Sequence, residues 1–138
     1  MFTGVYEEVI IVEGVFGKFV EERRKSLGIT LRGLAAMLDI APAFMSDIEK
    51  GHRYPPAKEK LYQLAEVLKL SAEDRDKMFD LAARERENTV SSDLSDYIME
   101  NDKVRVALRL ARDSGAEEKE WLKVIEMLEK ESKGDSND

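Results

Sequence analysis

The residues that enzymes commonly use for covalent or metal-assisted chemistry are scarce in this 138-residue chain. It has no cysteine and a single histidine, His52. Nucleophilic catalysis needs a nucleophile with an adjacent base, and metal-assisted catalysis needs several ligands. Adjacent glutamates occur three times, but their polar surroundings are typical of solvated helix faces; the pairs begin at Glu7, Glu21 and Glu117. The sequence therefore predicts no enzyme, no metal site and no cofactor.

Cations and backbone N–H groups that can hold an anion are better placed. Lys50, His52 and Arg53 follow one another closely, and Arg32 stands just after Thr30, a residue type that caps helices. A helix start can present free N–H groups to a phosphate. We predict that phosphates are bound by Thr30, Arg32, Lys50, His52 and Arg53. The simpler alternative for Arg32 and Lys50 is a solvated charge, and for His52 an exposed turn residue.

Two short helices joined by a tight turn are predicted to position these residues. They span residues 30–38 and 42–50, and their apolar positions recur at helical spacing: Leu31, Leu34, Ala35, Leu38, Met45 and Ile48. Asp39 marks the turn because aspartate tolerates left-handed backbone better than most residues. Pro42 suits a first helical turn, and Gly51 ends the second helix. Two helices in this arrangement are typical of a helix-turn-helix that reads DNA.

The pattern T-x-x-x-L-A-x-x-L-x-I-x-x-x-x-(I/M)-S-x-I-E-x-G-x-R-x-P begins at Thr30 and ends at Pro55. It resembles the phage-repressor-type (Cro/repressor, or XRE) helix-turn-helix family, and the resemblance covers roughly residues 16–70. The resemblance implies an all-α, five-helix repressor-like DNA-binding domain and a transcriptional regulator. It also implies an ion pair in which Arg24, near the end of the first helix, meets Glu49 and orients the second helix.

A helix in the major groove presents its first turns to the base edges. The candidates for reading bases are Pro42, Ala43, Phe44, Ser46 and Asp47. They are unusual readers, because the family often has Gln, Asn, Arg or Ser there and a Ser or Thr cap where this chain has Ala41. Ala43 or Phe44 would contact thymine methyl groups, and Ser46 is an adaptable partner. Asp47 would accept a hydrogen bond from cytosine; alternatively it caps the helix or pairs with a neighbouring arginine.

The net charge of −7 is unevenly distributed. Residues 15–56 carry seven basic and five acidic side chains, whereas residues 89–138 carry eight basic and thirteen acidic ones. Phosphate binding depends on the local charge, so the acidic tail does not argue against DNA. We expect modest affinity with a strong dependence on salt.

The remaining chain is predicted to be mostly helical. Residues 1–14 are β-prone and are interpreted as either a pairing arm or an extension ahead of the domain at 15–87. Within that domain the predicted helices span residues 16–27, 30–38, 42–50, 57–70 and 71–87. A polar linker is predicted at 88–92, a helical C-terminal region at 93–131 and a disordered acidic tail at 132–138. The C-terminal helices are predicted at 93–99, 102–113 and 116–131.

The C-terminal region has apolar faces that need a partner. Trp121, Ile125 and Leu128 share one face of the last helix and are expected to pack on Val104 and Leu108 of the preceding one. These residues would help to form either a dimer interface or a groove for another protein.

The sequence thus predicts a dimeric repressor bound to a pseudo-palindromic double-stranded operator, because one helix reads too few base pairs for useful specificity. The alternative is an antitoxin or similar module that binds a partner protein through its C-terminal helices. Wholly apolar runs such as residues 9–12 are far short of the ~20 residues that span a bilayer, and the acidic N-terminus is unlike a signal peptide. A location in the bacterial cytoplasm, with no membrane partner, is expected.

Overall fold

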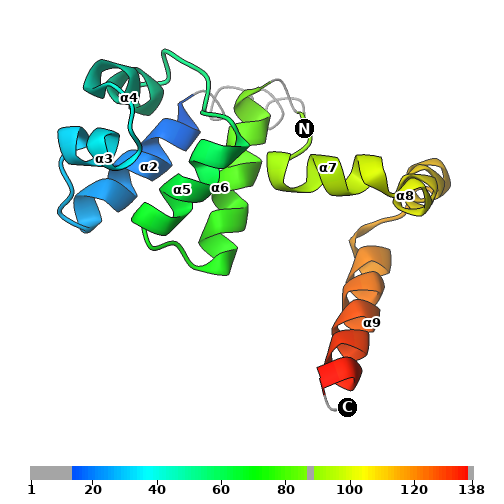
Figure 1. The fold of residues 1–138 in the computed structure, drawn as a ribbon. Coiled ribbons are helices and arrows are strands. Elements are labelled where there is room, and N and C mark those ends of the chain that lie inside the picture. Colours follow the sequence, from blue (N-terminus) through cyan, green and yellow to red (C-terminus); the bar gives the residue numbers. More distant parts are fainter. Residues whose placement is uncertain (1–13, 87–88, 137–138) are drawn as a thin grey trace. The chain divides into compact units, whose positions relative to one another are not determined.

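A computed structural model describes residues 14–86 and 89–136, and every regular element in these ranges is a helix (Figure 1). The predicted N-terminal arm lies almost wholly outside the described residues. The chain divides into two compact units, residues 1–96 and 97–138.

Five helices of the first unit form the domain expected from the sequence (Figure 1). They are α2 (Val15–Ser26), α3 (Leu31–Met37), α4 (Pro42–Glu49), α5 (Lys58–Val67) and α6 (Ala72–Glu85). The hydroxyl of Thr30 accepts a hydrogen bond from the Gly33 N–H at 3.0 Å, and the hydroxyl of Ser71 caps α6 in the same way. These caps satisfy N–H groups that a helix start leaves without partners.

The turns between the helices follow the predicted chemistry, with one correction. Asp39 has φ 56° between α3 and α4, and Gly51 has φ 79° after α4, as predicted. The fourth helix, however, ends at Val67 and not at Leu70. Lys69 adopts φ 54°, and the Leu70 N–H returns to the Ala65 carbonyl at 3.0 Å. This left-handed cap ends the helix although the apolar spacing continues beyond it.

One hydrophobic core holds these five helices together. Large side chains from all of them are fully or almost fully buried: Phe16, Val20, Leu34, Leu38, Met45, Ile48, Leu61, Leu64, Leu68, Met78 and Phe79. Burying a side chain of this size contributes roughly 1.5–3 kcal/mol. Ala35 is also fully buried where α3 meets α4, so the two helices are fixed to each other by packing.

The segment predicted as a linker is partly packed on the first unit. Ser91 is buried and donates to the Asp80 carboxylate, and α7 (Ser92–Glu100) begins at the next residue. Lys58 on α5 forms an ion pair with Asp96 at 2.7 Å. The division between the two units accordingly falls after Asp96, later than the predicted linker at 88–92. Short polar stretches look alike in sequence whether or not their hydroxyls find buried partners.

The second unit contains the end of α7, then α8 (Asp102–Ser114) and α9 (Glu118–Ser136). Gly115, with φ 71°, separates α8 from α9. α9 continues to Ser136, beyond the predicted end at Glu131, so the tail expected to be disordered is helical over most of its length. The added residues 132–136 include Gly134 and Asp135, which are poor helix formers, so intrinsic propensity does not explain the extension.

The described residues of α8 and α9 include no buried side chain. Trp121 is 38% exposed and Leu128 is 58% exposed, although both are large and apolar. The predicted packing of the last helix on Val104 and Leu108 therefore stays a prediction. None of the helices in the described ranges is both long and apolar enough to cross a bilayer.

Candidate nucleic-acid interface

A buried ion pair fixes α4 on α2. Arg24 Nε lies 2.8 Å from Glu49 Oε2 and Nη2 lies 3.0 Å from Oε1, while Nη1 donates to the Ile29 carbonyl at 3.0 Å. Arg24 is only 8% exposed and Glu49 only 6%. The hydrogen bond to Glu49 raises the pKa of Arg24, against the opposing effect of burial. The structure thus brings together, in bidentate geometry, the two residues that the resemblance paired. The additional bond of Arg24 to the Ile29 carbonyl holds the segment that leads into α3.

The backbones of α2 and α4 approach each other closely beside this pair. Gly17 is buried, and a Cβ atom there would lie 2.6 Å from the carbonyl oxygen of Ile48 and would also overlap that of Glu49. Only glycine fits at this crossing. Backbone contact and ion pair together set the orientation of α4.

The face of α4 opposite the core is available to a partner. Met45 and Ile48 are buried in the core, whereas Pro42 and Ala43 are exposed. Ala41 provides no side-chain cap, and proline occupies the first turn, as expected from the sequence. Ser46 is partly buried beside them.

Phe44, Asp47 and Arg53 form a cluster beside this face. The Arg53 guanidinium lies 4.3 Å from the centre of the Phe44 ring, and its Nη2 atom is 3.9 Å from Asp47 Oδ2. Phe44 is itself half-buried and packs on the core. This geometry favours the interpretation in which Asp47 pairs with an arginine. The positive charge of Arg53 partly offsets the negative charge of the Asp47 carboxylate.

The other predicted phosphate-binding residues lie at the start of α3 and just after α4, and their side chains are exposed. Arg32, Lys50 and His52 are all exposed, and within the described chain neither Arg32 nor Lys50 is in an ion pair. Thr30 is exposed as well, but its hydroxyl is engaged in capping α3. The cations thus remain free to meet phosphate oxygens.

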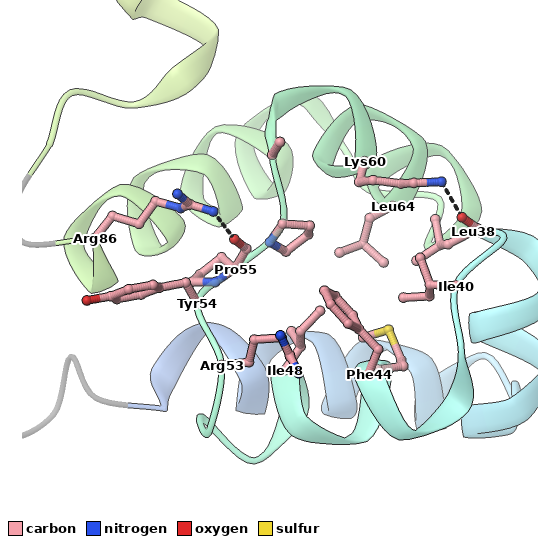
Figure 2. A pocket seen from close by; sticks show the side chains of 13 residues that line it. Leu38, Ile40, Phe44, Ile48, Arg53, Tyr54, Pro55, Lys60, Leu64 and Arg86 are labelled. Carbon is pink, nitrogen blue, oxygen red and sulfur yellow. Dashed lines mark hydrogen bonds between the residues drawn. The ribbon is translucent and has the colours of Figure 1, made fainter.

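Sequence reasoning missed a residue that holds the loop carrying Arg53. Arg86, at the end of α6, donates from Nη2 to the Pro55 carbonyl at 2.5 Å, and its guanidinium lies 5.7 Å from the Tyr54 ring centre (Figure 2). A partner that is a backbone carbonyl leaves no trace in the pattern of side chains. No sequence signal could have identified this contact.

Residues 20–74 match the protein-family model described as Helix-turn-helix. The matched segment contains the whole of α3, α4 and α5, and thus the exposed face of α4. Fold and match together define residues 20–74 as a helix-turn-helix, a class of domain that binds DNA. Residues 20–74 are an XRE-type helix-turn-helix domain, and the protein is a DNA-binding transcriptional regulator.

A solved chain from the structure titled "SINR PROTEIN/SINI PROTEIN COMPLEX" is 19% identical to this one. The alignment covers 86% of this chain and 98% of that chain, with a TM-score of 0.43. A TM-score this low does not establish a shared overall architecture. No curated protein sequence matches the chain.

Proposed function

We propose that this regulator is a dimeric repressor that inserts α4 into the major groove of a pseudo-palindromic operator. The observation that carries the proposal is the two-sided character of α4. Its inner side is held by the core and by Arg24, while Pro42 and Ala43 at its first turn are exposed. A reading helix needs this combination of a fixed axis and accessible first-turn side chains.

The proposed contacts divide into base and phosphate contacts. Pro42 and Ala43 would pack on thymine methyl groups, and Ser46 would hydrogen-bond to a base edge. Phe44 and Asp47 retain their proposed base contacts, but their interactions with Arg53 favour a role in placing that cation. Phosphates would be held by Thr30, Arg32, Lys50, His52 and Arg53.

Dimerisation is proposed to occur through the second unit. α8 and α9 expose apolar side chains, and no described residue of either helix is buried. α8 carries four basic and two acidic residues, whereas α9 carries four basic and six acidic ones. Opposite net charges on two apolar-faced helices favour pairing α8 of one copy with α9 of another. Two coupled domains would then reach half-sites about 34 Å apart.

Footprinting on the DNA upstream of the protein's own gene tests this function. We expect protection of two half-sites separated by one helical turn, bound by a dimer in sedimentation experiments. Ala43→Glu should abolish protection because it brings a carboxylate against the DNA. Ala72→Glu is the matched control, since Ala72 is also exposed in the first turn of a helix but lies on α6. Protection by a monomer, or equal binding by both variants, would contradict the proposal.

The exposed faces of α8 and α9 also support a second candidate function. They would suit the binding of a partner protein, which this chain would neutralise as an antitoxin neutralises its toxin. DNA binding would then be limited to the regulator's own operon. A toxin-like reading frame beside the gene would favour this alternative. If the chain stays monomeric in solution but binds the protein encoded by that neighbouring gene, the antitoxin function would be favoured over the homodimeric repressor.

A further inference from the structure

A cavity of about 440 Å³ lies between α4, α5 and the loop that joins them (Figure 2). Its wall is largely apolar: α4 contributes Phe44, Met45 and Ile48, the loop contributes Pro55, and α5 contributes Leu64. This volume is within the roughly 300–1,000 Å³ of ligand pockets. Phe44 is only half-buried, so a ligand in the cavity would cover apolar surface that folding leaves accessible.

The polar groups of the lining are unusual because the charged ones are all cationic. Arg53, Lys60 and Arg86 line the cavity, and no carboxylate does. Lys60 donates to the Leu38 carbonyl, and Arg86 to the Pro55 carbonyl (Figure 2). An ammonium group has three donors and a guanidinium five, and each of these bonds uses one. Within the described chain no carboxylate pairs with Lys60 or Arg86. Positive charge and free donors therefore remain at an apolar cavity.

We propose that this cavity binds a medium-chain carboxylate. The aliphatic chain lies against the apolar wall between α4 and α5, and the carboxylate is held by the free donors of Lys60, which is half-buried. Lys60 is the best placed of the three cations, because partial burial strengthens its attraction for an anion. A neutral ligand would leave this charge without a counterion.

Occupancy of the cavity weakens DNA binding, a step that rests on the proposed function. Phe44 lines the cavity and carries the Arg53 guanidinium on its ring. A ligand that repacks Phe44 therefore also moves Arg53, which is proposed to bind a phosphate. The ligand favours the displaced arrangement and DNA the undisplaced one, so each lowers the affinity for the other.

Calorimetric titration of the full chain with octanoate, and with 1-octanol as the uncharged probe, tests the site. We expect saturable binding of octanoate. Ala57→Trp should weaken it about tenfold or more, because exposed Ala57 lines the cavity and the indole would occupy it. Ala72→Trp is the matched control at an exposed position away from the cavity, and it should bind octanoate as the wild type does.

The role of the charge is tested with Lys60→Met. It should weaken octanoate binding about tenfold, the value of one charge-assisted hydrogen bond, and leave 1-octanol binding unchanged. The unchanged binding of 1-octanol also shows that the variant is folded. Absence of saturable binding to the wild type, or wild-type affinity in Ala57→Trp, would overturn the site. Equal loss of both probes in Lys60→Met would overturn the assignment of the carboxylate.

Fluorescence anisotropy with an operator fragment, with and without octanoate, tests the coupling. We expect a higher Kd for DNA in octanoate and no response in Ala57→Trp. Octanoate binding without any change in the DNA Kd would overturn the coupling. A protein that binds no DNA in the absence of octanoate would instead refute the proposed function, and calorimetry would still decide the site.

Discussion

Removing Glu49 should destabilise the first unit by about 3 kcal/mol. The carboxylate accepts two hydrogen bonds from Arg24, at 2.8 and 3.0 Å, and both side chains are almost fully buried. Breaking a buried pair by removing one partner costs about 3–5 kcal/mol, because the other charge stays desolvated. Arg24 keeps its bond to the Ile29 carbonyl, which places Glu49→Ala at the lower end of that range.

Urea unfolding monitored by amide exchange of buried residues such as Leu64 measures this loss in the first unit alone. Glu21→Ala is the control, because Glu21 pairs with Lys25 at 3.5 Å on the surface of α2 and such pairs contribute about 0–1 kcal/mol. The double variant Arg24→Met with Glu49→Ala should recover part of the loss, since no charge is then stranded. Strict additivity of the two substitutions, or a Glu49→Ala variant within about 0.5 kcal/mol of the wild type, would refute the reasoning.

Four further predictions concern DNA binding, pH and packing. Arg53→Ala or Lys50→Ala should each weaken DNA binding about equally across sequences and reduce the salt slope by roughly one unit; wild-type affinity at every salt concentration would exclude a phosphate contact. Burial raises the pKa of Asp93, so protonation of this carboxyl favours the folded state. This stabilisation is fully present below the usual carboxyl pKa and is lost as the pH rises through the raised pKa. Asp93→Asn should therefore raise the Tm at pH 7 and not below about pH 3.9, and an equal effect at both pH values would contradict this assignment. Truncation after Asp96 should leave a folded helix-turn-helix unit, seen by amide exchange, that binds the operator more weakly; undiminished dimerisation and affinity would mean that the second unit serves a purpose other than DNA binding. Gly17→Ala should lose the cooperative unfolding transition, because its Cβ has no room at the helix crossing, and an unchanged transition would show that the two backbones can separate.

The sequence was sufficient for the parts of the fold that depend on local chemistry. Apolar spacing, the Thr30 cap and the left-handed tolerance of Asp39 identify α3, the turn and α4 without any long-range information. The α5 terminus was missed because Lys69 has no intrinsic preference for positive φ. Its conformation follows from the return of the Leu70 N–H to Ala65, which the apolar pattern does not encode.

Contacts with backbone atoms and the full extent of the cavity could not have been predicted. Lys60 and Arg86 bind carbonyl oxygens contributed by distant segments, and the linear pattern does not distinguish such cations from solvated ones. The Arg24–Glu49 pair was predictable only through the family resemblance, because spacing alone does not select these two residues among many charges. The base-reading and phosphate-binding assignments and the C-terminal interface stay predictions.

The stacking of Arg53 on Phe44 has a thermodynamic consequence for Lys50 and Arg53, the two cations that follow the end of α4. Arg53 is restrained before DNA arrives, whereas Lys50 is exposed and unpaired within the described chain. Immobilising a free, rotamer-rich side chain at an interface costs roughly 0.5–1.5 kcal/mol, largely as entropy. The phosphate contact of Lys50 would therefore carry most of this ordering cost, and that of Arg53 little. The two phosphate contacts would then differ in the enthalpy and entropy of binding although the two side chains have equal charge. The contact of Arg53 would have the smaller entropic cost, because its side chain is already restrained.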